Sequence, residues 1–199
     1  MHRYILPLLV GLIATASSGC EGPNPNLGAT AASVQLGTGE NAFEAVADGQ
    51  MLHAASGGQG GVHIWGSFRL DGFSVQGGPP LGFVGMRVEM GIEHSEGSVA
   101  GMDPFDASVN AATGEFSGGT VFVGIDPQRT PFLYPPGFWS GEDESASPSS
   151  EEWQEAQEYL EESLTEGLTM WVRVEDSEGS VLEDAFSIGI EGVSAEPWG

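Results

Sequence analysis

Apolar and polar residues alternate along most of the chain, and a period of two is typical of β-strands that bury one face. In the segment from Val62 to Leu70, aliphatic and phenyl side chains fall on one face, which we expect to be buried. His63, Trp65 and Arg69 then fall side by side on the opposite face, away from the core. The same alternation predicts further strands near residues 34–36, 83–93, 121–125, 170–175 and 181–191.

A hairpin is expected just before this segment. Asp48-Gly49 stands between two extended runs in residues 43–54, and a two-residue Asp-Gly loop is typical of a type I′ turn. In that register Glu44 faces His53 across the two strands, where the carboxylate and the imidazole would pair. The sequence therefore predicts a Glu44–His53 contact within a local hairpin.

One segment departs from the β pattern. Residues 130–141 are rich in proline and aromatic residues, and residues 142–166 hold ten acids and no base. Within them, Ser149 and Glu152 have the spacing of a capping box, and apolar residues follow at steps of three and four. We expect one amphipathic helix at about 151–165, which forms only when its narrow apolar stripe is docked. The stripe consists of Trp153, Ala156, Leu160 and Leu164.

The expected fold class is all-β. About seven or eight short strands separated by turns, with no regular alternation of strands and helices, favour antiparallel pairing. We expect a β-sandwich of immunoglobulin-like type, with a jelly roll as the alternative. The predicted domain spans residues 33–195, and residues 130–167 form an insertion that contains the aromatic loop and the acidic helix.

The N-terminal segment has the plan of an export signal. A short polar start precedes the apolar run Tyr4–Ala16, which is too short to span a bilayer. The end of the run, up to Gly19-Cys20, resembles the lipobox of bacterial lipoproteins. This resemblance implies cleavage before Cys20 and lipid attachment to its thiol. We expect residues 1–19 to be a signal peptide and residues 20–32 to be a flexible stem.

Acidic residues dominate the composition and limit the partners that the chain can have. Asp and Glu number 29, against five basic residues that are all Arg, and the net charge is −24. Such a surface repels nucleic acid and anionic headgroups, so we expect no nucleic-acid partner. Cys20 is the single cysteine, so an internal disulfide is excluded.

Motifs for catalysis are weak in the sequence. The four His residues do not have the spacing of a zinc enzyme, and the segment around Ser95 lacks the first glycine of a nucleophile elbow. We therefore expect no enzymatic activity and no cofactor. The alternative is a metal-binding protein that holds copper or calcium through His53 and His63 with nearby Met residues or acids.

The run from Leu36 to Leu70 combines LGTGE, a Phe-Glu pair, a DG turn and GGQGGVHIW in one order. In this combination it resembles an uncharacterised group of predicted bacterial lipoproteins that carry a GxQGGxHxW segment. The resemblance implies an exported, tethered, β-rich domain, and it brings no known activity. The residues that match this segment are Gln59, Gly60, Gly61, His63 and Trp65.

These features predict a lipid-anchored binding or structural module of the bacterial envelope. Cys20 would attach it to the membrane, and Glu21, in place of Asp after the cysteine, favours the outer membrane, on its periplasmic or its surface side. The expected partner is an envelope protein or a glycan. It would bind the aromatic loop Phe132–Trp139 or the face formed by Gln59, His63, Trp65 and Arg69.

Overall fold

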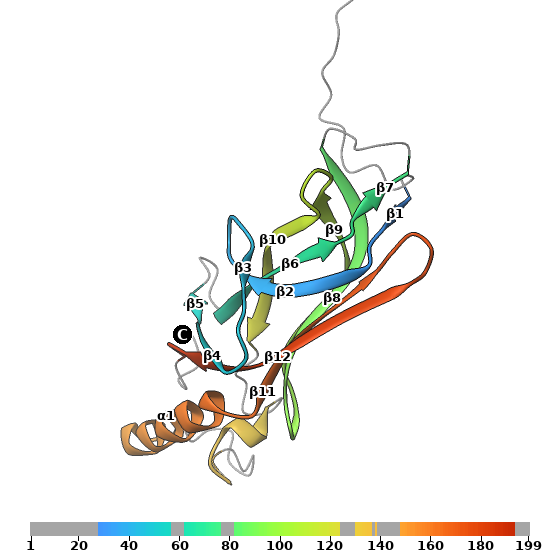
Figure 1. Ribbon diagram of the computed structural model, residues 1–199. Helices are drawn as coiled ribbons and strands as arrows, with labels where there is room; N and C mark the ends of the chain where they lie inside the picture. Colours follow the sequence, from blue (N-terminus) through green and yellow to red (C-terminus); the bar gives the residue numbers. More distant parts are fainter. Residues whose placement is uncertain are drawn as a thin grey trace, which may run out of the picture.

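The computed structural model describes residues 28–56, 62–76, 82–123, 130–136, 138 and 148–193. These residues are mostly strands, consistent with the expected all-β sandwich, and include one α-helix (Figure 1). The strands are β1 (Ala29–Thr30), β2 (Ser33–Thr38), β3 (Glu44–Ala45), β4 (Gln50–His53), β5 (Ala55–Ser56), β6 (Val62–Asp71), β7 (Ser74–Val75), β8 (Phe83–His94), β9 (Gly97–Asn110), β10 (Glu115–Val123), β11 (Leu168–Glu175) and β12 (Val181–Glu191).

Ten of these strands form one bent sheet. Its order is β3-β2-β6-β10-β9-β8-β11-β12-β4, with β5 paired to β6, and only the β12–β4 pair is parallel. The sheet bends so that β2 contacts β11 and β12 without strand pairing, and the Leu36 N–H donates a 2.7 Å hydrogen bond to Asp184 Oδ2. Strands β1 and β7 form a small second sheet, at the opposite end of the molecule from the helix (Figure 1).

The alternation predicted for β8, β11 and β12 is confirmed. Every second residue of β8 is buried from Val84 to Ile92, and Met170, Val172 and Val174 of β11 are buried as expected. The core fills the space between the two halves of the bent sheet. Gly66 of β6 allows this close packing, because a Cβ there would lie 2.8 Å from Met90 Cε.

The predicted acidic helix is also confirmed, as α1 (Ser150–Thr165). Ser149 and Glu152 form the capping box, in which the Ser149 N–H donates a 2.7 Å hydrogen bond to Glu152 Oε2. This bond, with a second from the Ser149 hydroxyl, lowers the pKa of Glu152 below its usual value. The helix contacts β12 and the short 3₁₀ helix η1 (Pro131–Leu133) through its buried residues Ala156, Leu160 and Leu164.

The predicted Asp48-Gly49 hairpin is wrong. The Gln50 N–H still closes a turn onto the Ala47 carbonyl at 3.0 Å, but only Gly49 has a positive φ, whereas a type I′ turn needs two. The turn is attached to β12 instead, because Asp48 Oδ1 accepts a 3.0 Å hydrogen bond from the Ser187 N–H. Strand β4 therefore extends the edge of β12, and β3 pairs with β2.

The predicted Glu44–His53 contact is wrong for the same reason. Glu44 lies opposite Thr38 in the β2–β3 pair, and His53 lies opposite Glu191 in the β4–β12 pair. His53 Nδ1 is 3.7 Å from Glu191 Oε1, and both side chains are exposed. A long-range strand ladder has replaced the local one, because pairing with β12 satisfies the backbone of β4 along the edge of the sheet.

The long strand β9 and the early start of the fold were not expected. Strand β9 contains an exposed Pro104 beside an irregularity in its pairing with β8, where two residues of β9 oppose Glu89. Strand β1 lies within the segment expected to be a stem, and it pairs with β7. The fold thus begins before Ser33, whereas the expected signal peptide and residues 20–27 lie outside the described residues.

Candidate functional site

The face of β6 that was expected to be open is largely closed. His63 is only 6% exposed and Ser67 is fully buried, whereas Trp65 and Arg69 are half-buried. The His63 and Trp65 rings meet edge to face, with centroids 4.5 Å apart, and the Ser67 hydroxyl donates a hydrogen bond to the Thr38 carbonyl. The prediction that His63 lies on an exposed face is wrong, because its ring packs against Trp65 and the residues of β6 from Val62 to Leu70 are buried or half-buried on both faces.

Phe43 covers the part of this face that carries Arg69. The Phe43 ring lies against Gly37 of β2, where a Cβ would overlap the ring and lie 2.6 Å from the Glu44 carbonyl oxygen. The Arg69 guanidinium carbon is 4.8 Å from the centroid of the same ring, and Arg69 Nη2 donates a 2.7 Å hydrogen bond to Gln35 Oε1. These residues of the LGTGE and Phe-Glu motifs therefore have a packing role.

Of the other predicted contact residues, only part of the aromatic loop lies within the described residues. Gln59 and Cys20, like Trp139, lie outside the described residues. In the aromatic loop, Phe132 is half-buried and stacks on His94, and Tyr134 is buried and stacks on Phe138, with ring centroids 5.3 Å apart. Phe138 in turn meets Trp153 of α1 edge to face, so the described part of the loop anchors the helix.

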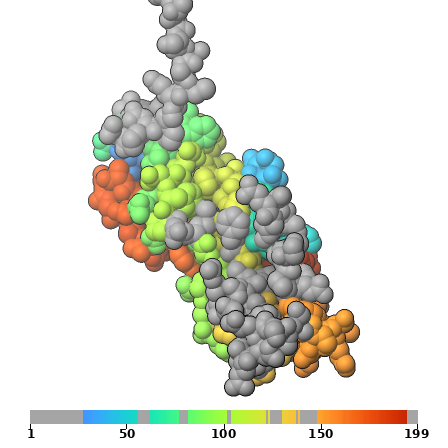
Figure 2. Space-filling view, turned by 180° about the vertical axis from the view of Figure 1, so that it is seen from behind, coloured from blue at the N-terminus to red at the C-terminus, as the bar shows by residue number. Residues whose placement is uncertain are grey.

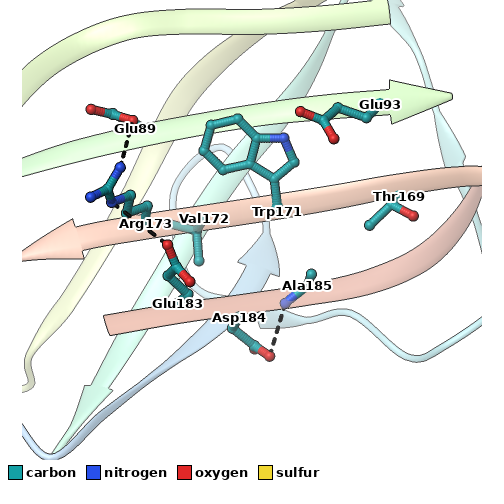
Figure 3. A pocket seen from close by; sticks show the side chains of 9 residues that line it. All are labelled: Glu89, Glu93, Thr169, Trp171, Val172, Arg173, Glu183, Asp184 and Ala185. Atoms are coloured by element: carbon teal, nitrogen blue, oxygen red, sulfur yellow. Dashed lines mark hydrogen bonds and ion pairs between the residues drawn. The ribbon is translucent and has the colours of Figure 1, made fainter. Parts of the chain in front are cut away.

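The outer face of β8, β11 and β12 carries a groove of about 640 Å³ (Figure 3). It forms where alternate residues of β11 point away from the core, toward the end of the sheet that carries β4. Figure 2 shows the molecule from behind, with β8 and the start of β9 in green across the middle of this view. The residues that line the groove are Glu89, Glu93, Thr169, Trp171, Val172, Arg173, Glu183, Asp184 and Ala185.

Trp171 lies at the centre of the groove. In the strand register it stands between Gly91 of β8 and Ala185 of β12, and its indole extends toward β8 (Figure 3). A Cβ at Gly91 would lie 2.7 Å from Trp171 Cζ2, so only glycine leaves room for the ring there. The indole Nε1 is buried and has no hydrogen-bond partner among the described residues. The two small neighbours thus leave a half-buried aromatic surface in the groove.

Charged residues stand on both sides of this indole. On one side Arg173 forms ion pairs with Glu89 and Glu183, at 3.9 Å and 3.6 Å. On the other side Glu93 is exposed, and its carboxylate is drawn close to the nitrogen edge of the ring (Figure 3). Three carboxylates and one guanidinium surround Trp171, so the groove has a net negative charge, as the whole chain has.

Asp184 has a structural role at the rim of the groove. Its Oδ2 accepts the hydrogen bond from the Leu36 N–H, and Oδ1 accepts one from its neighbour, the Ala185 N–H. The carboxylate therefore connects β12 to β2 across the bend of the sheet. We do not count it among the groups available to a ligand.

The residues proposed for metal binding are poorly placed to hold an ion. His53 is exposed beside Glu191, whereas His63 is buried beside Trp65, and Met86 and Met90 are core residues. No three His, Cys, Asp or Glu residues are grouped to hold a metal ion within the described part of the chain. In the same part, no helix has both the length and the apolar character needed to cross a bilayer.

Comparison with known proteins finds no relative that bears on this site. No family model matches the sequence, and no curated protein is similar enough to count as a match.

Proposed function

We propose that the protein is a lipid-anchored, non-enzymatic binding module of the bacterial envelope, and that it binds its partner in the groove over Trp171. The observation that carries the binding role is an open groove with an aromatic surface on a rigid three-strand face. Concave sites that combine an aromatic surface with a few fixed polar groups are typical of ligand-binding sites. The proposed partner is an envelope protein or a glycan.

The proposed anchor rests on the lipobox-like end of the apolar run at Cys20. The test is to express the full-length chain in a bacterium, separate the membranes, and measure the mass of the N-terminal peptide. We expect the outer-membrane fraction to contain the chain with an acylated Cys20. The C20A variant should lose the lipid and the membrane association, and S33A, outside the lipobox-like segment, is the control. A chain that stays in the membrane fraction after C20A would contradict the proposal.

The binding role is tested with the full-length chain in neutral detergent. Envelope oligosaccharides and peptides are titrated by calorimetry into the parent chain, W171A and F83A. Phe83 is the control because it is 55% exposed and lies outside the groove. We expect at least one probe to bind the parent and F83A but not W171A. If no probe binds, or if W171A binds as well as F83A, the groove is not the site.

Two finer proposals remain from the sequence. Within the all-β sandwich class we propose the immunoglobulin-like type, supported by the antiparallel pairing from β6 through β12 and by the packing of β2 against β11 and β12, with the jelly roll as the alternative.

The second candidate function, copper or calcium binding, has no supporting cluster among the described residues. Calorimetric titration with Cu(II) and Ca(II) tests it, and binding tighter than about millimolar would favour it.

A further inference from the structure

An aromatic ring lies over a strand glycine both at Phe43 and at Trp171. Phe43 lies over Gly37, and Trp171 lies over Gly91. In the first place the ring already has a cation on it, because the Arg69 guanidinium is 4.8 Å from the ring centroid. The chain itself therefore shows that a guanidinium fits an aromatic surface of this construction.

In the groove, the nearest arginine of the described chain is held beside the ring. Arg173 is two residues along β11 from Trp171, and its guanidinium is paired with both Glu89 and Glu183. None of the ring or cation–π contacts found among the described residues involves Trp171. No aromatic ring or cation of the described residues therefore occupies the indole surface, which is open to a group from another molecule.

The surrounding charge selects the sign of that group. Glu89 and Glu93 lie on the same face of β8, on either side of Gly91, so a ligand over the indole lies between two carboxylates. Tryptophan is the aromatic side chain that attracts cations most strongly, and neighbouring carboxylates add to the attraction. A chain with no Lys and few Arg also has little positive charge of its own to compete for the groove.

We propose that the groove binds a guanidinium or ammonium group from a basic segment of a partner protein, seated on the Trp171 indole. Glu93 contacts the cation on one side of the ring, and the Glu89–Arg173–Glu183 ion pairs border it on the other. The inference rests on the proposed function of this groove and specifies the chemistry of its partner. A neutral glycan is the outcome that would contradict it.

The experiment compares two peptides of nearly equal shape, of which only one carries positive side chains. The full-length chain in neutral detergent is titrated with acetyl-Gly-Arg-Gly-Arg-Gly-amide and with the same peptide carrying citrulline, a neutral analogue of arginine of nearly equal shape. A tetramer of N-acetylglucosamine is the neutral glycan probe. We expect the arginine peptide to bind about tenfold more tightly than the citrulline peptide, and to weaken as salt is raised.

Variants place the binding in the groove. W171A should weaken binding of the arginine peptide about tenfold, and E93Q should weaken it several-fold. E175Q removes the same charge from the outer face of β11, outside the groove, and should change the binding little. W171F keeps an aromatic ring if W171A fails to fold, and it should bind the peptide more weakly than the parent chain. Circular dichroism and the melting temperature establish that each variant is folded.

Four results would overturn the proposal. Equal binding of the arginine and citrulline peptides would remove the role of charge, and equal weakening by E93Q and E175Q would show nonspecific attraction to an acidic surface. Binding of the glycan alone, lost in W171A, would reject the cation and leave the binding function of the groove standing. If none of the three probes binds, the cation proposal fails, and the wider ligand titration decides whether the groove binds anything.

Discussion

Two surfaces of this protein use the same construction and end in different states. On β2 and β6, Phe43 lies over Gly37 and receives the Arg69 guanidinium, which also bonds to Gln35. On β8 and β11, Trp171 lies over Gly91, but the neighbouring arginine is held by Glu89 and Glu183. The first surface is completed by the chain's own side chains, whereas the second leaves its ring at the floor of an open groove.

The difference shows what separates a packing motif from a binding site. In both places glycine makes room for an aromatic ring, and in both an arginine lies near that ring. The partner of the arginine decides the outcome: Gln35 positions Arg69 over its ring, whereas two carboxylates hold Arg173 away from the indole. Four substitutions test this comparison, and they are arranged by the size of the effect that we expect on stability.

The largest effect is expected for G37A. The new Cβ would overlap the Phe43 ring and lie 2.6 Å from the Glu44 carbonyl oxygen, which is backbone and cannot rotate away. We expect a loss of about 2 kcal/mol in the free energy of unfolding, measured by chemical denaturation. A loss under about 0.5 kcal/mol would mean that the segment carrying Phe43 is not fixed on β2.

The next effect is expected for R69M, which keeps much of the side-chain volume. It removes the cation from the Phe43 ring and the donor from Gln35 Oε1. Because Arg69 is half-buried, we expect a loss of only about 1 kcal/mol in the free energy of unfolding. R87M is the control, because Arg87 is exposed on the outer face of β8. Equal effects of both variants would contradict a specific role for Arg69.

A smaller loss of stability is expected for G91A, of about 0.5–1 kcal/mol. The three atoms nearest to its Cβ would all belong to the half-buried Trp171 ring, and a side chain can shift where backbone cannot. Displacement of the ring should nevertheless weaken binding of the arginine peptide about as much as the W171A substitution does. Calorimetry on G91A, with G85A as the control because nothing lies within 4 Å of a Cβ there, separates this effect from a general change in β8. Unchanged peptide binding would contradict the role of the indole.

The smallest effect on stability is expected for R173M. Its ion pairs are long and its side chain is 47% exposed, so we expect a change within about 0.5 kcal/mol. Loss of this guanidinium leaves Glu89 and Glu183 without their cation, and the arginine peptide should then bind several-fold more tightly. Weaker binding of the peptide to R173M would contradict this difference between the two surfaces, because Arg173 would then contribute to binding rather than hold the carboxylates.

Local signals were sufficient for much of the framework. The alternation of β8, β11 and β12 and the capping box of α1 follow from contacts between residues close in sequence, and the structure confirms them. The alternation that buries Met170 and Val172 also points Trp171 and Arg173 outward, so the sequence held a signal for the groove. That signal could not be interpreted, because Gly91 and Glu89 come to Trp171 from a strand about 80 residues away.

The sequence by itself determined the strands that alternate clearly, where the acidic helix begins, and which side of those strands is apolar, because these depend on the pleat of the backbone and on local hydrogen bonds. Only the tertiary structure decided which polar faces stay open. Asp48-Gly49 turned toward β12 and His63 was buried, since long-range pairing and packing on both sides of a sheet depend on neighbours distant in the chain. The same neighbours closed the surface at Phe43 and left the groove at Trp171 open.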